Sequence, residues 1–173
     1  LKSGSTVYIG GSFTTAGGQS RTNIAALDAS TALATSWAPD ADQQVSCMRL
    51  NGSDIIVGGF FSNIGLQARN YLAAISVSSG AATTWDPSPN YFIETIELNG
   101  STAYVGGAFS FIGGQPRNNI AEINLSTGSA TTWNPNANNT VKIIKLIGSN
   151  VYVGGPFTTI GGQTRNNLAA IST

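Results

Sequence analysis

The chain has 173 residues, of which 41% are hydrophobic and only 9% are charged. This composition predicts a folded domain with a buried core and excludes a disordered tail. Because eight basic and eight acidic residues cancel, the chain lacks the positive charge that nucleic acids and anionic membranes attract. We therefore expect no nucleic-acid partner. No apolar run approaches the roughly 20 residues that a membrane helix needs, so we also expect no insertion into a membrane.

A repeat of 48 residues runs through the whole sequence. Glycine pairs, arginines and tryptophans recur at this step, so each of them serves every unit in the same way. These repeated positions, which we interpret as structural, are Gly10, Gly11, Gly58, Gly59, Gly106, Gly107, Gly154 and Gly155; Arg21, Arg69, Arg117 and Arg165; and Trp37, Trp85 and Trp133.

Each unit is expected to contain four short strands, which the second unit shows in chain order. Its strands a to d are predicted at residues 45–50, 54–59, 71–77 and 82–85. Asn51 and Gly52 suit the tight turn of a hairpin between strands a and b. Pro87 ends strand d, because proline has no N–H to donate to a neighbouring strand.

Four antiparallel strands in a period of this length predict an all-β protein, a β-propeller built of four-stranded blades. A β-sandwich or a stacked β-solenoid is the alternative, but neither explains so regular a unit. The chain is expected to form one region, 1–173, with blades at residues 1–43, 44–91, 92–139 and 140–173.

The predicted blades do not close a ring, since the first lacks strand a and the last lacks strand d. This leaves about three and a half blades, with two open apolar faces that need a cover. We expect an excerpt of a larger ring or array, and next a homo-oligomeric ring. A small four-bladed closure is the third option.

Several sequence motifs carry a family resemblance. The order "IIVGG", "LAAISVSSG" and "TTW" resembles the kelch repeat, in which a double glycine closes the second strand and a tryptophan marks the fourth. "VYVGGPFTTIGGQTRNN" and "TTWNPNAN" are similar to the delta-60 type of propeller repeat in secreted bacterial proteins, and to repeats in fungal cell-polarity ectodomains. The resemblance spans nearly the whole chain and implies a kelch-like fold, but propellers host many unrelated activities.

Catalytic groups are scarce. The chain contains no histidine, which excludes Ser-His-Asp and Cys-His centres and imidazole metal sites. The carboxylates occupy no common column, and Glu94 and Glu97, three residues apart, should point to opposite faces of one strand. Apolar neighbours indicate that Cys47 is a buried thiol. We expect no enzymatic activity, no catalytic residue, no cofactor and no metal.

The repeated residues also have functional interpretations. The glycine pairs could cradle a phosphate, but no helix is predicted behind them, so we assign them to the end of strand b, where the backbone must turn or pack closely. The arginines should bond loop carbonyls or join neighbouring blades, and the alternative is a ring of cations that grips an anionic glycan. The tryptophans should pack between blades, and the alternative is stacking on sugars. Asparagine-rich stretches could ligate calcium, but turn chemistry explains them.

Charges alternate along the predicted a strands. Arg49, Glu97 and Lys145 hold equivalent positions in successive units, as do Glu94 and Lys142. Strand a lines the channel of a propeller, so we expect ion pairs between neighbouring blades there.

Partner-binding residues are expected in the long connections, because the b-to-c and d-to-a connections should emerge on one face of the blades. The loops 38–44, 86–92 and 134–140 differ between units while the scaffold stays constant, as in many recognition surfaces. The candidates are Asp40, Asp42, Tyr91, Phe92, Asn136 and Asn138, with Tyr71 and Phe111 as further aromatics. Each of the four aromatics could equally belong to the core.

The sequence thus favours a non-catalytic module, secreted or at the cell surface, for structural assembly or for binding a protein or glycan. Self-association through the open blade faces is included. The alternatives are the non-catalytic part of a larger extracellular glycan-active enzyme and an architectural subunit of a surface layer or filament.

Overall fold

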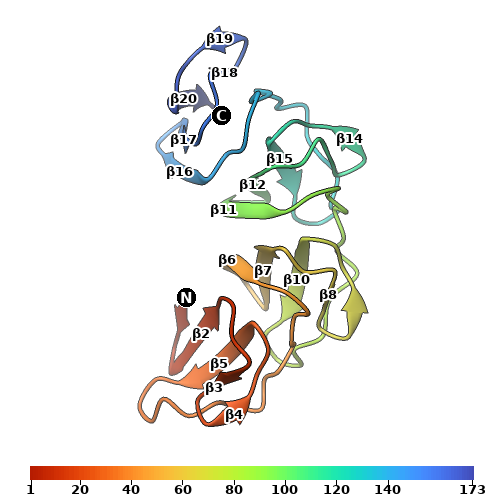
Figure 1. Ribbon diagram of the computed structural model, residues 1–173, viewed down its shortest axis with the longest axis vertical. Helices are drawn as coiled ribbons and strands as arrows, with labels where there is room; N and C mark the ends of the chain where they lie inside the picture. The colour runs from red at the N-terminus through yellow and green to blue at the C-terminus, as the bar shows by residue number, and fades with distance from the viewer.

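The computed structural model describes all 173 residues as strands and turns, without a helix. Four three-stranded antiparallel sheets follow one another along an open arc (Figure 1). These sheets, the first to fourth blades, consist of β1 (Lys2–Ser3), β2 (Thr6–Gly10) and β5 (Ile24–Asp28); β6 (Val45–Asn51), β7 (Asp54–Gly59) and β10 (Leu72–Ser76); β11 (Ile93–Asn99), β12 (Thr102–Gly107) and β15 (Ile120–Asn124); and β16 (Ile143–Ile147), β17 (Asn150–Gly154) and β20 (Leu168–Ser172).

Each blade also carries a small two-stranded hairpin where the sequence predicted a long b-to-c loop. The hairpins are β3 (Thr15–Ala16) with β4 (Gln19–Ser20), β8 (Asn63–Ile64) with β9 (Gln67–Ala68), β13 (Phe111–Ile112) with β14 (Gln115–Pro116), and β18 (Thr159–Ile160) with β19 (Gln163–Thr164). Their turns use two residues with positive φ, such as Gly113 at +60° and Gly114 at +76°, which is the geometry of a tight β-hairpin.

Strand d differs from the prediction. In the second blade it pairs with β10 at a single bridge, between Ile75 and Ala82, and does not form a continuous strand. Its backbone groups are shared between elements, because the N–H of Ala82 donates to Gly65 O of the hairpin at 3.0 Å, while the N–H of Thr83 donates to Ala74 O of β10 at 2.8 Å. Segment d therefore links the sheet to the hairpin.

The first blade also differs in detail, because a remnant of strand a is present. Strand β1 pairs with β2 through Lys2 with Val7 and Ser3 with Thr6. In the second blade, Leu50 pairs with Ile55 and Asn51 with Asp54. The register is the same after subtraction of 48 residues, so β1 corresponds to the end of strand a.

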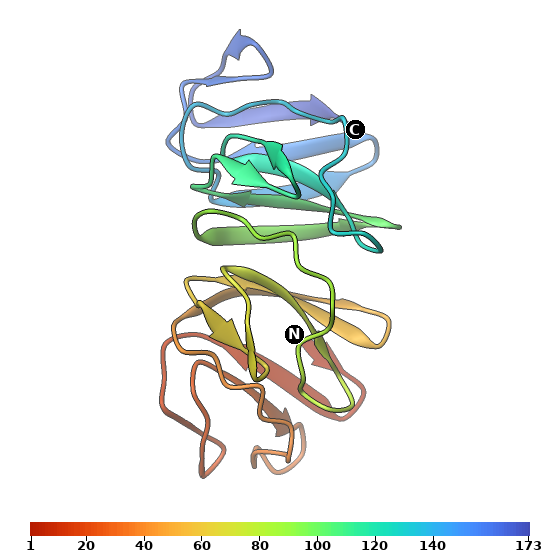
Figure 2. The same cartoon turned by 90° about the vertical axis from the view of Figure 1, so that its right-hand side faces the viewer.

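The hydrophobic core lies between the blades, whose sheets stack face to face along the long axis (Figure 2). Three buried clusters each mix residues of two adjacent blades. In the first cluster, Tyr8 and Trp37 of the first blade pack with Phe61 of the second. Burial of apolar surface therefore joins blade to blade, as it must when each sheet is too thin to hold its own core.

In the glycine pair of the second blade, the first glycine permits this close stacking and the second permits close approach within its own blade. A Cβ on Gly58 would lie 2.6 Å from Cγ2 of Ile93 in the next blade, and one on Gly59 would lie 2.2 Å from the backbone oxygen of Gln44. Neither distance is compatible with a side chain, so these positions require glycine for backbone approach and not for a positive φ.

Candidate functional site

The d-to-a connections and the hairpins meet on one face, which we call the loop face. Asp42 accepts hydrogen bonds from the backbone N–H of Ser62 at 2.8 Å and from Nδ2 of Asn63 at 2.9 Å. Asn90 and Asn138 accept the equivalent backbone bonds in the next two blades. The expected convergence of the b-to-c and d-to-a connections is therefore present, and it is fixed by hydrogen bonds.

The repeated arginines form hydrogen bonds to the backbone of their own blades. Arg21, Arg69 and Arg117 each donate from Nη2 to the carbonyl of a threonine in segment d of the same blade, at 2.5–2.6 Å. Arg165 donates instead to Ala170 O at 2.7 Å. The guanidinium groups of Arg21, Arg69 and Arg117 therefore donate to backbone carbonyl oxygens, and their Nε atoms are buried.

The tryptophan column ties one blade to the next. Trp37 Nε1 donates to Ser76 O at 2.9 Å, and Trp85 Nε1 donates to Asn124 O at 3.1 Å, each across a blade joint. Trp133 repeats this bond at the last joint, with Ser172 O as acceptor. Because the rings of Trp37 and Trp85 are only 7% and 8% exposed, they do not form a platform for a ligand.

An ion-pair triad joins three a strands. Glu97 accepts from Arg49 Nε at 3.2 Å and from Lys145 Nζ at 2.5 Å, so the expected pairing between neighbouring blades is present. Burial raises the pKa of Glu97, but hydrogen bonds from Lys145 and Arg49, together with their charges, outweigh it and hold the pKa below its usual value. The triad thus links the a strands of three consecutive blades.

A groove of about 420 Å³ lies on the loop face between the first two blades. Asp40, Asp42 and Leu66 line it, and no cation of the chain forms a salt bridge with either carboxylate. Burial raises the pKa of Asp42, but hydrogen bonds from Asn63 and Ser62 lower it by more. Both Asp candidates thus lie together, whereas Asn136 and Asn138 belong to the last joint.

An aromatic cluster occupies the loop face at the joint of the second and third blades. Phe60 and Phe92 stack with ring centroids 4.4 Å apart and an interplanar angle of 20°, and Tyr91 lies 4.7 Å from Phe92. Tyr71 extends the cluster at 6.1 Å from Tyr91. Tyr91 is 52% exposed. We call these four residues the aromatic cluster. Phe111 has no ring contact with them.

The aromatic cluster departs from the repeat at all four positions. Where the cluster has Phe60, Tyr71, Tyr91 and Phe92, the third and fourth blades have Ala108, Asn119, Asn139 and Thr140. Tyr71 adopts a φ of +62°, a left-handed conformation that asparagine tolerates and a bulky aromatic rarely adopts. Sequence reasoning did not single out Phe60, although comparison of its column, which holds serine, alanine and proline elsewhere, would have done so.

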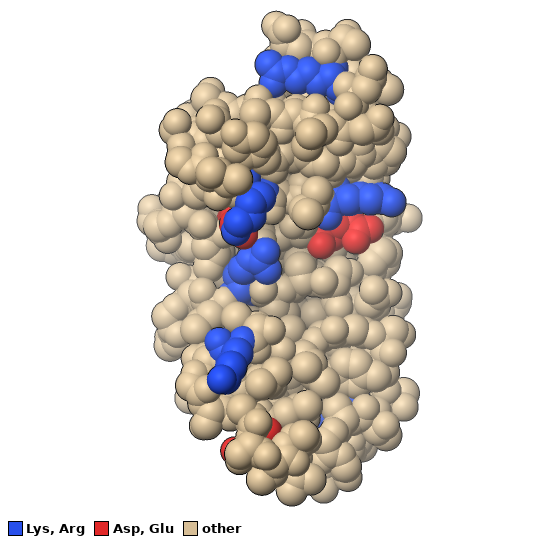
Figure 3. All heavy atoms as spheres, turned by 90° about the vertical axis from the view of Figure 1, so that its left-hand side faces the viewer, with Lys and Arg blue, Asp and Glu red and all other residues tan.

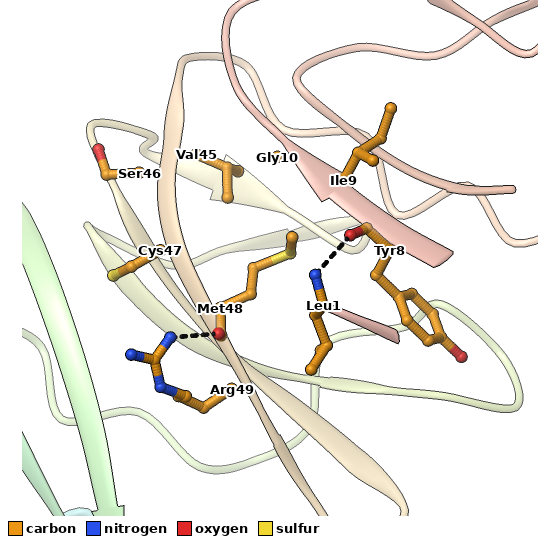
Figure 4. Close-up of a pocket in the computed structure, with 9 residues that line it drawn as sticks. All are labelled: Leu1, Tyr8, Ile9, Gly10, Val45, Ser46, Cys47, Met48 and Arg49. Carbon is orange, nitrogen blue, oxygen red and sulfur yellow. Dashed lines mark hydrogen bonds between the residues drawn. The ribbon is translucent and has the colours of Figure 1, made fainter. Parts of the chain in front are cut away.

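A second cavity, of about 380 Å³, lies between β2 and β6 (Figure 4). Leu1 and Tyr8 form one side and Met48 the other, and the Leu1 amino group donates to Tyr8 O at 3.1 Å. The cavity contains no carboxylate. Burial raises the pKa of the neighbouring Cys47 thiol to about 12, so the sulfur stays protonated and is a poor nucleophile at neutral pH.

The remaining surface offers little charge. The side on which the arc opens carries only scattered basic and acidic groups (Figure 3). The structure has no group of three or more Cys, Asp or Glu side chains placed to hold a metal ion. It also has no helix with the length and apolarity required to cross a membrane.

Comparisons with known proteins address the fold. A family described as "Domain of unknown function (DUF5122) beta-propeller" matches residues 99–130, in the third blade. The crystal structure of the computationally designed Ika4 protein is similar, with a TM-score of 0.54 and 10% identity over 86% of this chain and 78% of that one. No curated protein sequence matches.

The computationally designed Ika8 protein is similar over a longer stretch. Its crystal structure gives a TM-score of 0.59 and 15% identity, covering 100% of this chain but 50% of the Ika8 chain. The present chain thus spans half the length of that protein. With its arc of stacked sheets, the family match in the third blade and these two structures, the chain is a β-propeller.

Proposed function

We propose that the chain is a non-catalytic, kelch-like propeller module that is secreted or displayed at the cell surface and binds a protein or glycan through its loop face. The resemblance to delta-60 repeats of secreted bacterial proteins supports this location. The absence of histidine and the raised pKa of the only thiol support a role in binding and not in catalysis.

The aromatic cluster carries this proposal. A scaffold residue is expected to recur in every blade, as the arginines and tryptophans do. The four aromatics occur in one joint only, and Tyr91 remains half exposed. An exposed aromatic group on connections held by a rigid scaffold is typical of a recognition surface.

The test uses the chain's own repeat as the source of substitutions. In the repeat-matched variant, Tyr91→Asn with Phe92→Thr, two cluster residues become those of the fourth blade at the same columns. Binding to arrays of glycans and of extracellular proteins is measured for the wild type and for the repeat-matched variant. We expect ligands that bind the wild type and not the variant. The control, Phe111→Thr, likewise copies the fourth blade outside the cluster and should bind as the wild type does. If ligands bind both variants equally, the loop-face proposal is wrong.

Self-association is a second candidate, favoured by the uncovered face of the fourth blade. There Ile143 is 61% exposed, Leu168 is 69% exposed and Tyr152 is 38% exposed. At the same columns in the third blade, Ile120 and Tyr104 are at most 1% exposed, because the fourth blade covers them. We therefore propose that, in the 173-residue chain by itself, this face, which we call the end face, packs against another copy of the chain.

Sedimentation velocity tests this candidate over a range of protein concentrations. The wild type should form dimers or larger species, and Ile143→Glu with Leu168→Glu should shift it to monomers, because two carboxylates cannot be buried in an apolar joint. Leu66→Glu is the control, since Leu66 is 92% exposed but lies away from the end face. A wild type that stays monomeric at about 100 µM would contradict self-association, because a specific apolar interface between two copies normally binds more tightly.

A further inference from the structure

We propose that the aromatic cluster binds the apolar face of a sugar ring, with Tyr91 as the stacking surface. This inference rests on the proposed function, whose ligand class it narrows to a neutral saccharide. The four rings of the cluster differ in how much of their surface is exposed to solvent.

Phe60 and Phe92 form the base of the cluster. Their near-parallel rings, 4.4 Å apart, cover one another, and both side chains are half-buried. Phe92 in turn supports Tyr91 at an angle of 44°. The base therefore holds Tyr91 in place, so that a ligand need not immobilise the ring on binding.

Tyr91 is the ring that remains available. It is 52% exposed, the largest exposure among the four, and Tyr71 lies beside it at a centroid distance of 6.1 Å. Both tyrosines add a hydroxyl to an apolar ring, so the surface is amphipathic. A pyranose has the matching character, with an apolar C–H face and a rim of hydroxyl groups.

Two residues with neutral amide side chains adjoin the cluster, one through a backbone hydrogen bond and one in the chain. Gln44 and Asn70 are exposed, the backbone oxygen of Gln44 accepts from the Phe60 N–H at 2.9 Å, and Asn70 precedes Tyr71 in the chain. Amides donate and accept hydrogen bonds, as sugar hydroxyls do. The cluster itself has no ionisable cation or carboxylate, which favours a neutral ligand over an anionic one.

The shape of the surface favours a sugar over a proline-rich peptide. None of the three cavities in the structure includes any residue of the aromatic cluster. A polyproline helix docks into an aromatic-lined groove, whereas a single ring can lie on an open platform. An open platform also predicts weak binding, with a dissociation constant of about 1 mM for one sugar unit.

The backbone at Tyr71 indicates that stability alone does not explain the cluster. Asn119, at the same column, has nearly the same φ, +63°, and its side-chain amide donates to Ala137 O at 2.8 Å. Tyrosine cannot form that bond and adopts the left-handed conformation at a cost of about 1 kcal/mol. The Tyr71 ring packs partly against the core, and a role in binding accounts for a side chain that this backbone conformation disfavours.

The experiment is an NMR titration of the full chain with cellobiose, maltose, lactose and chitobiose, followed by amide shifts and by saturation transfer to the sugar. We expect shifts at residues 60, 70–71 and 91–92 for at least one disaccharide. Tyr91→Ala should weaken binding about tenfold, the loss expected for one stacking contact. Tyr91→Phe keeps the ring and should stay within about twofold of the wild type.

Two controls separate stacking from folding. Phe111→Ala removes an aromatic that is 42% exposed on the same face, and it should leave the affinity unchanged. Thermal unfolding of Tyr91→Ala should match the wild type within a few degrees, because an exposed side chain contributes little to stability.

The proposal is overturned if no disaccharide shifts the cluster at concentrations up to about 50 mM, or if Tyr91→Ala binds as well as the wild type. It is also overturned if a proline-rich peptide shifts these residues and the sugars do not. In that last case the loop face remains a binding surface and only the ligand class is wrong. Array ligands that bind the repeat-matched variant and the wild type equally would refute both proposals.

Discussion

The ion-pair triad predicts that Glu97→Gln lowers stability in a pH-dependent way. The Glu97 side chain is 10% exposed and accepts from Arg49 and Lys145, which are 40% and 64% exposed. Because both cations retain water, each pair contributes no more than a surface pair. Because the carboxylate itself is largely buried, we place the contribution near the upper end of that range, about 0.5–1 kcal/mol. Glutamine keeps one acceptor oxygen but loses the charge, so we expect a loss of about 1–2 kcal/mol at pH 7.

The sign of the pH dependence follows from the lowered pKa of Glu97. A carboxyl whose pKa is lower in the folded than in the unfolded state stabilises the fold above the unfolded pKa, about 4.3. That contribution disappears as the pH falls through the folded pKa. The wild type should therefore lose this stability as the pH falls below about 4.3, and the difference from Glu97→Gln should shrink over the same range.

Urea unfolding at pH 7 and at about pH 2.5 measures both free energies. Arg49→Gln and Lys145→Gln, alone and combined with Glu97→Gln, give the coupling energy of each pair. A stability difference that is the same at both pH values would refute the electrostatic account. So would a coupling energy indistinguishable from zero for both pairs.

Three further predictions concern stability and reactivity. Leu66→Gly should leave the unfolding free energy unchanged or raise it by up to about 1 kcal/mol, because Leu66 has a φ of +63° where three other units have glycine; a clear loss in thermal unfolding would contradict this. Trp85→Phe should cost about 1–2 kcal/mol in urea unfolding, because Asn124 O loses its donor across the joint, and an unchanged midpoint would show that the bond is dispensable. Cys47 should react slowly with iodoacetamide at pH 8 in the native protein and rapidly in urea, since burial raises its pKa to about 12; equal rates would contradict its burial.

The blade architecture follows from residues that every unit repeats. Gly58 and Gly59 mark where β7 approaches its neighbours, and Trp85 marks where a ring crosses the joint. Such contacts need one residue type at one position, so the sequence records them at a fixed spacing. The alternating charges of Arg49, Glu97 and Lys145 likewise predict ion pairs between blades, because equivalent positions of adjacent strands face one another.

The hairpins and segment d were beyond prediction for a physical reason. Strands of two residues, such as β13 and β14, are too short to show an alternating pattern. The threonines of segment d have the β-branched character of a strand, but its hydrogen bonds go partly to the hairpin and to an arginine side chain. Propensity describes a residue's local preference and does not identify its hydrogen-bond partner.

The candidate site is marked by residues that depart from the 48-residue repeat, and not by residues that follow it. A position that stabilises every blade is expected to keep its residue, as Arg69 and Trp85 do in their columns. Tyr71 replaces an asparagine that fits the left-handed backbone and bonds the neighbouring connection in another blade. Tyr91 adds a large ring that stays half in water. Tyr71 packs partly against the core of its joint, but it lacks the amide bond of the asparagine, and half of Tyr91 stays in water. Packing therefore accounts for only part of these two changes. Their contact in one cluster, at 6.1 Å, supports a shared role in binding.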